Sequence, residues 1–355
     1  MSILHDRPTT LFRSPTDLTA DAPPEARGES RDSVRLLVAT HDGIRHTTFR
    51  HLDRFLSAGD VLVINTSATV PGQLDATRGA EPVVLHIANR LADGTRVVEL
   101  RTAPDARDPI LNGSPEERLV LTGGGALTLL DPYPHDGSSP PGGRGNRLWR
   151  ARVEIEEPLA DYLRRVGRPI SYGYLRERFR IEHYQTVFAL HPGSAEMPSA
   201  GRPFTPELVT RLVAAGVVFA PITLHTSVSS QEAGEGPLAE WFTVSTQSAA
   251  LINAAKSAGH RVIAVGTTAT RAVESVADPA GFVRSGTGWT EIVISSLRPI
   301  RTIDGLITGW HDPEASHLLL VEGVAGPELA QRGYDAAVDH RYRWHEFGDS
   351  GLFLP

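Results

Sequence analysis

The sequence predicts an α/β fold, a mainly parallel sheet with helices on both faces, plus an inserted all-β, barrel-like domain. Short apolar runs such as Val61–Asn65 and Val217–Leu224 are typical of strands buried inside a sheet. After about residue 150 such runs alternate with helical segments, which indicates parallel strands covered by helices. Between Gly72 and about Arg150 the chain has only β-rich runs and turns, which predicts a separate β domain.

The α/β domain is expected to begin in residues 1–71. Residues 1–33 are rich in Pro, Asp and Arg and are expected to be extended. Arg35–Thr40 is predicted to be a strand, followed by a turn at Asp42-Gly43. Val61–Asn65 ends in polar residues, so we expect a buried strand with a loop at its carboxyl end.

The inserted domain is expected in residues 72–150. Asp93-Gly94 separates two β-rich runs, which predicts a hairpin. Pro132–Asn146 is rich in Gly, Pro and Ser and is predicted to be a loop. The expected strands are Pro82–Asn89, Arg96–Thr102, Arg118–Leu121, Ala126–Leu130 and Leu148–Ile155. No helix is predicted here.

The α/β domain is expected to resume in residues 151–355. Thr205 is a good N-cap and Pro206 suits the first helical position, so a helix is predicted from there to Gly216. Further helices are expected at Glu157–Val166, Gln247–Ala258, Ala269–Val276 and His317–Val324. Further strands are expected at Val217–Leu224, Arg261–Val265, Glu291–Ser295 and Asp304–Ile307.

Length and composition narrow the class of protein. The 355 residues exceed what one hydrophobic core usually serves, so two domains are expected. Hydrophobic residues make up 40% and charged residues 22%, as in globular proteins. No apolar run approaches the ~20 residues of a membrane span, and we expect no secretory signal in residues 1–30. Because cysteine is absent, disulfides and thiolate sites are excluded, and a cytoplasmic protein without a membrane partner is expected.

Charge and motifs exclude further classes. The net charge of −7 argues against a chain built mainly to coat nucleic acid. Lys256 is the single lysine and is expected to be solvated, so a Gly-Lys-Ser/Thr phosphate loop is excluded. Neither the Gly-x-Ser-x-Gly motif of α/β hydrolases nor the Gly-x-Gly-x-x-Gly dinucleotide fingerprint follows a predicted strand.

Polar residues follow several predicted strands, and ligands of open α/β sheets bind at the carboxyl ends of strands. These residues are Asn65, His225, Gly266-Thr267-Thr268 and His311. The best candidate segment is Arg261–Ser275, where Gly266 permits a tight turn and the following helix start favours an anion. Arg271 and Glu274 lie one turn apart on that helix. The alternative is a structural strand-turn-helix in which Thr267 or Thr268 is a plain N-cap.

Two further segments are candidates. In Gly286–Glu291, Trp289 offers a stacking face and Glu291 could accept a hydrogen bond, although the segment could equally be a turn with a half-buried Trp. In His311–His317, Pro313 interrupts the spacing that a zinc site needs, so no metal is expected. His311 is better suited to an orienting or acid/base role, and His317 to a structural one.

The C-terminal run Arg343–Asp349 is polar and aromatic, whereas chain ends commonly fray. Such a run could close over the site, or it could be a docked tail without a role.

Several longer segments of the sequence resemble segments of a known protein family. The strongest segments are Tyr184-Gln185-Thr186-Val187, Phe204-Thr205-Pro206-Glu207-Leu208, Thr223-Leu224-His225, Val265-Gly266-Thr267-Thr268 with Arg271, Glu274 and Ser275, Gly288-Trp289-Thr290-Glu291, and Gly348-Asp349; weaker ones are Arg31-Asp32-Ser33 with Arg35–Val38, and Gly59–Asn65. In combination they resemble the S-adenosylmethionine:tRNA ribosyltransferase-isomerase family of queuosine biosynthesis. The similarity spans nearly the whole chain and is weakest across Gly72–Arg150.

The resemblance implies an α/β domain with an inserted β-barrel, in agreement with the prediction above. It implies transfer and isomerisation of the ribosyl part of S-adenosylmethionine onto a 7-aminomethyl-7-deazaguanine in tRNA, with release of adenine and methionine. S-adenosylmethionine is then a co-substrate, no metal is needed, and tRNA is the partner. A sulfonium makes its neighbouring carbon acidic, so a positioned base could start the rearrangement.

Residue roles follow from the resemblance. It implies catalytic roles for His225, Glu240 and His311. Adenine could stack on Trp289, and the methionine carboxylate could meet Arg271 or the helix start after Gly266. The substrate-binding residues that it implies are Asn65, Tyr184, Gln185, Gly266, Thr267, Thr268, Arg271, Glu274, Trp289, Thr290, Glu291 and Asp349.

The sequence also departs from the family pattern. The family's Asn-Asp-Thr-Arg is Asn65-Thr66-Ser67-Ala68 here, and its Gly-Leu-His-Phe-Thr is Gly201–Thr205 with arginine and proline in the middle. Its glycine-rich Val-Gly-x-Gly-Thr-Phe becomes Thr226–Gln231, and Leu238 replaces a histidine before Glu240. Two alternatives therefore stand beside the family reaction: a diverged paralogue that uses S-adenosylmethionine with a small-molecule acceptor in specialised metabolism, and a non-catalytic S-adenosylmethionine-binding module.

Overall fold

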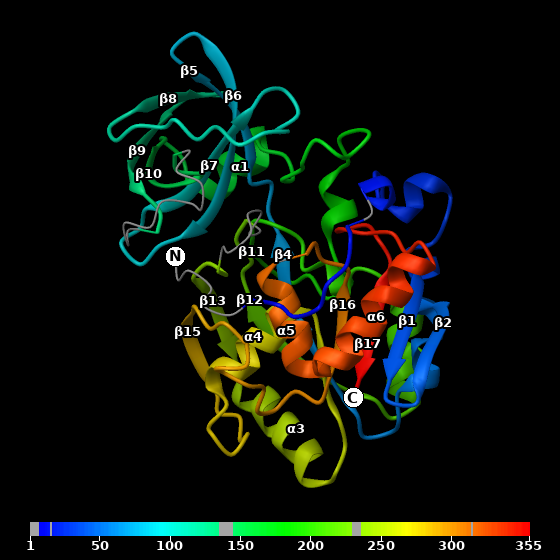
Figure 1. Cartoon of the computed structure of the whole chain (residues 1–355). Helices are drawn as coiled ribbons and strands as arrows, with labels where there is room; N and C mark the ends of the chain where they lie inside the picture. Colours follow the sequence, from blue (N-terminus) through cyan, green and yellow to red (C-terminus); the bar gives the residue numbers. More distant parts are fainter. Residues whose placement is uncertain (1–6, 15, 135–144, 229–235, 314) are drawn as a thin grey trace.

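The computed structural model describes residues 7–14, 16–134, 145–228, 236–313 and 315–355, which form a large sheet with helices and a separate barrel (Figure 1). In the described chain the large sheet has the strand order β15-β13-β12-β3-β14-β16-β17-β1-β2. The bounds are β15 (Gly286–Thr290), β13 (Glu240–Val244), β12 (Val218–Leu224), β3 (Val61–Asn65), β14 (Val262–Val265), β16 (Gly305–Gly309), β17 (Ser350–Leu354), β1 (Arg35–Thr40) and β2 (Gly43–Thr48).

The sheet is mixed, whereas the sequence had predicted a mainly parallel one. The four central strands β12, β3, β14 and β16 are parallel, as is the pair β17–β1. The other four pairs, β15–β13, β13–β12, β16–β17 and β1–β2, are antiparallel. The difference arises because β2, β13, β15 and β17 escaped prediction, and each of them pairs antiparallel with at least one neighbour.

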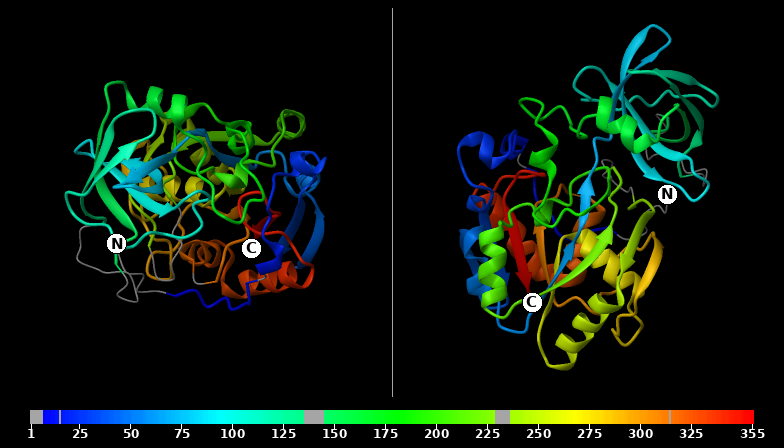
Figure 2. Two further views of the ribbon diagram at one scale, coloured as in Figure 1. Left: turned by 90° about the horizontal axis from the view of Figure 1, so that it is seen from above. Right: turned by 180° about the vertical axis from the view of Figure 1, so that it is seen from behind.

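Helices cover both faces of this sheet, as predicted. One face packs against α3 (Thr246–Ser257), α4 (Thr267–Val276), α5 (Ser316–Ala325) and α6 (Pro327–Asp339). The other packs against α2 (Pro206–Ala214) and the 3₁₀ segment η4 (Phe49–Phe55). The view from behind in Figure 2 shows α2 on the far side of the sheet from α3. The inward side chains on both faces are aliphatic and aromatic, so burial of apolar surface stabilises this layered core.

The inserted domain is a closed antiparallel barrel in the order β10-β7-β6-β5-β8-β9. Its strands are β5 (Gln73–Arg78), β6 (Glu81–Arg90), β7 (Arg96–Thr102), β8 (Arg118–Leu121), β9 (Ala126–Pro132) and β10 (Leu148–Glu154). The helix α1 (Leu159–Val166) packs Tyr162 and Leu163 on the barrel core, so this unit reaches beyond the expected end at residue 150. Most of the predicted loop at 132–146 lies outside the described residues.

The barrel is connected to the sheet at the carboxyl end of β3. The chain leaves the carboxyl end of β3, passes through β4 (Ser67–Thr69) and enters the barrel at β5. β4 pairs in parallel with β11 (His191–Ser194) on the return path. The barrel is therefore a lobe beyond the carboxyl end of the central strands, as Figure 1 and the view from behind in Figure 2 show.

Several local predictions were wrong. Residues 1–33 were expected to be extended, but they include the 3₁₀ turns η1 (Thr16–Leu18), η2 (Pro24–Arg27) and η3 (Arg31–Ser33); two others are η5 (Ile181–Tyr184) and η6 (Ser199–Gly201). The expected strand Glu291–Ser295 is irregular, and the strand is Gly286–Thr290 instead, because its backbone pairs with β13. Lys256 is not simply solvated, since its ammonium lies 2.9 Å from Asp304 Oδ1.

In the described part of the chain, no helix is long and apolar enough to cross a membrane.

A buried charged group lies on the outer side of the barrel wall, because Glu99 alternates along β7 with Val98 and Leu100, which pack in the barrel core. The Glu99 carboxylate lies 2.6 Å from Arg101 Nη1, 3.2 Å from Arg147 Nη1 and 3.3 Å from His86 Nδ1. Burial alone would raise the pKa of Glu99, but the nearby His86 and the charges of Arg147 and Arg101 lower it to about 2. The ionised carboxylate is therefore part of the folded barrel at neutral pH.

We expect Glu99→Gln to lower the free energy of unfolding at pH 7 by about 3–5 kcal/mol, because it removes the carboxylate from buried guanidinium groups. The pKa of Glu99 is depressed in the folded state, so its contribution is complete above the ordinary value of 4.5 and is lost as the pH falls toward 2. Chemical denaturation of both proteins at pH 7 and pH 3 measures the gap in stability. A gap of equal size at the two pH values would contradict this assignment.

Candidate active site

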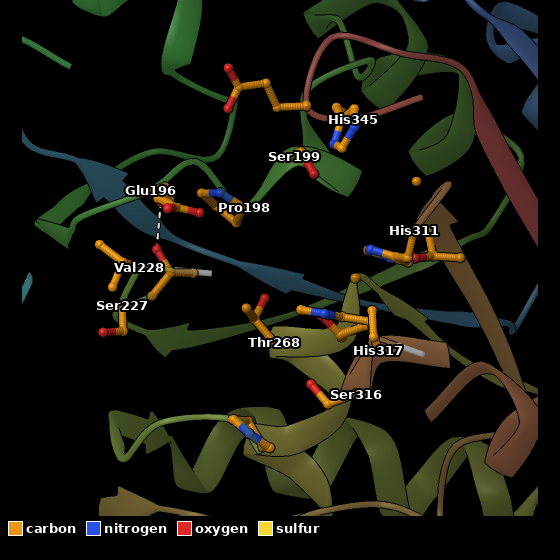
Figure 3. A pocket seen from close by; sticks show the side chains of 18 of the residues that line it. Glu196, Pro198, Ser199, Ser227, Val228, Thr268, His311, Ser316, His317 and His345 are labelled. Carbon is orange, nitrogen blue, oxygen red and sulfur yellow. Dashed lines mark hydrogen bonds between the residues drawn. The ribbon is translucent and has the colours of Figure 1, made fainter. Parts of the chain in front are cut away.

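A cavity of about 530 Å³ lies where the barrel meets the carboxyl ends of the central strands. The segments after β12, β14 and β16 supply one side, and barrel residues Arg101 and Arg107 reach in from the other. Figure 3 shows Glu196, Ser227 and Val228 on one side of it and His311, Ser316 and His317 on the other, with Thr268 between them. Volumes of roughly 300–1,000 Å³ are usual for pockets that bind small molecules.

Two helices begin at this cavity. At the start of α4, Gly266 has φ +92°, and a Cβ there would lie 3.2 Å from the Cβ of Ala200, so the turn requires glycine. Thr267 or Thr268 was expected to be the N-cap, but Gly266 holds that position and neither α4 nor α5 has a side-chain cap. Both helix starts therefore direct positive dipole ends and backbone N–H groups toward the cavity, which suits an anion.

The amide of Asn65 joins the elements beneath these helix starts. Its Nδ2 donates to the Leu224 carbonyl (2.9 Å) and to Thr268 Oγ1 (3.2 Å). Its Oδ1 accepts from the backbone N–H groups of Ser67 and Leu224, both at 3.0 Å. Asn65 is buried and does not line the cavity itself. Through these hydrogen bonds it sets the relative positions of β3, β4, β12 and α4.

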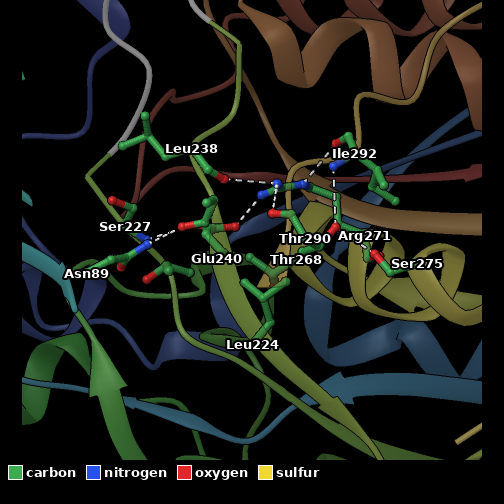
Figure 4. Close-up of polar contacts among 12 residues, drawn as sticks. Asn89, Leu224, Ser227, Leu238, Glu240, Thr268, Arg271, Ser275, Thr290 and Ile292 are labelled. Carbon is green, nitrogen blue, oxygen red and sulfur yellow. Dashed lines mark hydrogen bonds and ion pairs between the residues drawn. The ribbon is translucent and has the colours of Figure 1, made fainter. Parts of the chain in front are cut away.

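Arg271 and Glu240 form a buried ion pair at the cavity wall (Figure 4). Arg271 also donates to the carbonyls of Leu238 (3.1 Å) and Thr290 (3.0 Å). Glu240 accepts from the Ser227 N–H at 2.8 Å. Burial raises the pKa of Glu240 and outweighs the opposing charge of Arg271. The pair thus ties the loop after β12 to α4, and both charged groups already have protein partners.

Three histidines line the opposite part of the cavity. His311 stacks on His317 with ring centroids 4.6 Å apart, and His311 Nε2 lies 3.0 Å from Thr308 Oγ1. Burial lowers the pKa of His311 well below its usual value, with the neighbouring His317 and His345 adding to the effect. Burial likewise lowers the pKa of His317 to about 4. At neutral pH His311 and His317 are therefore uncharged and able to accept a proton or a hydrogen bond.

Tyrosines and carboxylates form a further wall, which sequence reasoning missed. Tyr172 donates to Glu196, and Tyr174 stacks on His345 with ring centroids 5.0 Å apart. The same wall includes Glu346, so the C-terminal run does reach the site. Only that tail offered a signal in the sequence; Tyr172, Tyr174 and Glu196 lie in segments without secondary-structure periodicity.

The cavity brings together only part of the predicted site. It is lined by Glu240, Gly266, Thr267, Thr268, Arg271 and His311 among the predicted residues. His225 lies just behind it: its Nδ1 is 2.7 Å from Ser67 Oγ, its ring stacks on Trp241, and burial lowers its pKa. In the described part of the chain, no group of three His, Cys, Asp or Glu side chains is placed to hold a metal ion.

Other predicted residues hold the framework instead of lining the cavity. Gln185 exchanges hydrogen bonds with the backbone of Thr69 (3.1 and 2.8 Å). Glu274 is buried and accepts from the N–H groups of residues 301, 302 and 303 at 2.9–3.2 Å. Asp349 lies 2.8 Å from Arg35 Nη2 in an ion pair at the second hollow described below.

The remaining predicted residues lie near the cavity or on the sheet edge. Tyr184 is buried against Phe347, next to Glu346. Trp289 is 41% exposed on the edge strand β15, away from the cavity lining. Thr290 accepts from Ser275 Oγ at 2.6 Å, and Glu291 is exposed. Their roles in substrate binding stay predictions.

Comparison with known proteins gives consistent matches. Residues 10–353 match the family described as Queuosine biosynthesis protein. The chain is 36% identical to an S-adenosylmethionine:tRNA ribosyltransferase-isomerase of Symbiobacterium thermophilum, over 96% of this chain and 97% of that protein. It is 35% identical to the protein of the same name from Desulfitobacterium hafniense, over 97% and 98%. The crystal structure of S-adenosylmethionine tRNA ribosyltransferase from Thermotoga maritima matches over 97% of this chain and 99% of that chain, with 26% identity and a TM-score of 0.51.

We expect Asn65→Ala to lower the free energy of unfolding by about 2–3 kcal/mol, because it leaves buried N–H and carbonyl groups unpaired. Hydrogen exchange should speed up at the amides of Ser67 and Leu224. Glu274→Ala is the matched control: it should cost a similar amount but expose residues 301–303 instead. Unchanged exchange at Ser67 and Leu224 in the Asn65 variant would argue against its joining role.

Proposed function

The chain belongs to the queuosine biosynthesis protein family, and from that premise we propose that it transfers and isomerises the ribosyl part of S-adenosylmethionine onto a 7-aminomethyl-7-deazaguanine in tRNA, releasing adenine and methionine. Its relatives are named S-adenosylmethionine:tRNA ribosyltransferase-isomerase, and in the proposed reaction S-adenosylmethionine is a co-substrate that gives up no methyl group. The observation that carries the assignment of the site is the cavity at the starts of α4 and α5.

The two helix starts are suited to the methionine carboxylate. Their dipole ends and backbone N–H groups need an anion, and Thr267 and Ser316 stand at the first positions of the two helices. Arg271 supports this subsite from below, through its pair with Glu240. Of the two partners expected from the sequence, Arg271 and the helix start after Gly266, the proposal keeps the helix start, because Glu240 engages the Arg271 guanidinium.

His311 is suited to the proton transfer that starts the reaction. The sulfonium of S-adenosylmethionine acidifies the adjacent carbon, and a neutral base must take the proton. His311 lines the cavity and its pKa is depressed by burial, so it is uncharged at neutral pH. Glu240 is less suited because it is engaged by Arg271 and Ser227.

A second hollow of about 810 Å³ supports tRNA as the acceptor. Its lining includes five arginines, Arg27, Arg35, Arg50, Arg341 and Arg343, with Ser30, Ser33 and the two carboxylates Glu29 and Asp349, of which Asp349 pairs with Arg35. Guanidinium groups bind phosphates with paired hydrogen bonds, so this hollow suits a polyanion although the net charge of the chain is −7. The segment 341–349 runs from this hollow to the cavity, where His345 and Glu346 lie.

A small-molecule acceptor is the second candidate. It is favoured by the loss of two charged family residues after Asn65, where Thr66 binds the Ile222 carbonyl at 2.9 Å and Ala68 carries no polar group. This candidate retains S-adenosylmethionine and changes only the acceptor.

The test is to incubate the protein with S-adenosylmethionine and measure adenine and methionine by chromatography. We expect release with tRNA that bears 7-aminomethyl-7-deazaguanine and none with unmodified tRNA. Release with the free aminomethyl-deazaguanine but not with the modified tRNA supports the second candidate. Absence of release with either acceptor would leave only a binding module and would overturn the proposed function.

The same assay tests the base. His311→Asn should reduce turnover by at least about 100-fold, within the usual contribution of a general base, and leave the dissociation constant of S-adenosylmethionine within about twofold. Because the pKa of His311 is depressed, the acid limb of the wild-type rate should lie below pH 6.5. The control variant is His317→Asn, which should retain most of the turnover. Equal losses in the two variants would contradict the assignment.

Arg343→Ala should weaken binding of tRNA and reduce the slope of log affinity against log salt by about one, because one phosphate contact is lost. Filter binding between 50 and 200 mM salt measures the slope. The matched control is Arg284→Ala, an arginine that is 70% exposed and lies outside the hollow. An unchanged slope in the Arg343 variant would place the tRNA elsewhere.

A further inference from the structure

We propose that Tyr172, Tyr174, Glu196 and Glu346, called here the acidic wall, form a subsite that binds the protonated primary amine of the acceptor. This inference rests on the proposed function, and it names the part of the cavity that selects the acceptor. The residues lie in separate segments of the chain: the connection after α1, the segment after β11, and the C-terminal tail.

One carboxyl oxygen of the acidic wall lacks a hydrogen-bond donor among the described residues. Glu346 Oε1 is buried and has no hydrogen-bond partner among the described residues. Glu196 lines the same cavity, and its Oε1 accepts from the Tyr172 hydroxyl. Buried carboxylate oxygens are nearly always hydrogen-bonded, so an unpaired one on a residue that lines a cavity indicates a donor that arrives with a ligand. An ammonium group carries three donors and no acceptor, which matches such a wall.

The surroundings of Glu346 disfavour its ionised form, which a bound cation would stabilise. Burial raises the pKa of Glu346 to about 8, and the charge of Glu196 adds to this effect. Arg202 and a hydrogen bond from Tyr174 oppose it only in part. Arg202 is already engaged, since its Nη2 lies 2.7 Å from Glu25 Oε2.

The other charged or titratable neighbours are already engaged, including Arg107, whose Nη2 lies 3.1 Å from Asp105 Oδ2. His345 stacks on Tyr174 and its pKa is lowered by burial. Arg101 enters from the barrel, where it binds Glu99 and lies over the Tyr172 ring at 4.9 Å. Tyr184 lies beside Glu346 and its pKa is raised by burial. A ligand ammonium would therefore complete the electrostatics of this wall.

Two sides of the cavity differ in the sign of the charge that they favour, which suits two substrates. The starts of α4 and α5 favour an anion, whereas the acidic wall repels one. Figure 3 shows Glu196 on the side opposite Ser316 and His317, at the start of α5. The methionine carboxylate and the acceptor amine would then bind at different sides, with the reacting ribosyl group between them.

Binding of two probes that differ only in the presence of the amino group tests the subsite directly. The probes are 7-aminomethyl-7-deazaguanine and its neutral counterpart 7-methyl-7-deazaguanine, titrated calorimetrically into the full-length protein. We expect the amine to bind at least about tenfold more tightly, as for a charge-assisted hydrogen bond. In E346Q and E196Q this preference should fall to about twofold or less, while the affinity for the methyl probe stays unchanged.

Proton release provides a readout that a merely structural role would not move. At pH 7 Glu346 is largely protonated because its pKa is about 8, and a bound ammonium favours its ionised form. Binding of the amine should therefore release up to about one proton, measured in buffers of different ionisation heat, and E346Q should release none. E328Q, at an exposed position on α6, is the control and should match the wild type.

The outcomes separate this inference from the proposed function. A wild-type protein that binds both probes equally, or neither, overturns the subsite even if adenine release with modified tRNA is normal. An amine preference that survives in both E346Q and E196Q overturns it as well. An amine preference lost in these variants supports the subsite even if S-adenosylmethionine turnover fails, in which case the proposed function alone is wrong.

Discussion

The amide of Asn65, buried at the carboxyl end of β3, holds together the elements that surround the cavity. Its side-chain oxygen and its side-chain nitrogen both form hydrogen bonds, and the partners are in Ser67, Leu224 and Thr268. No other side chain of similar size could satisfy two N–H groups and two oxygen acceptors at once. Since the barrel connection begins at Ser67 and α4 begins beside Thr268, the position of both depends on this one group.

Besides Asn65, the site contains ionisable groups whose pKa values are shifted by burial. His311 and His317 are kept neutral because a charged imidazole would lose its hydration. Glu240 is held by Arg271, so the loop after β12 is fixed to α4. The result is a cavity with two helix starts on one side, suited to an anion, and with the tyrosine and carboxylate wall that we propose as an ammonium subsite. This division is what a reaction between a carboxylate-bearing donor and an amine acceptor needs.

Patterns that repeat along the chain were predictable. Buried strands such as Val61–Asn65 and helices such as α3 carry their own apolar periodicity, so their existence and type followed from sequence. The outer strand β15 was misplaced by about five residues because Gly286–Thr290 has little apolar character and becomes a strand only by pairing with β13. The same limit explains why the parallel character of the sheet was overestimated.

The sequence by itself determined the α/β fold, the inserted barrel, the strand-turn-helix at Gly266 and the resemblance to a queuosine biosynthesis family. It did so because glycine at positive φ, buried apolar runs and contiguous motifs are local features. Only the tertiary structure decided that Arg271 binds Glu240, that Glu274 binds backbone, and that Glu196 and Glu346 meet in one cavity. Those contacts join segments far apart in the chain, and which side chains meet depends on how the sheet, barrel and tail pack together.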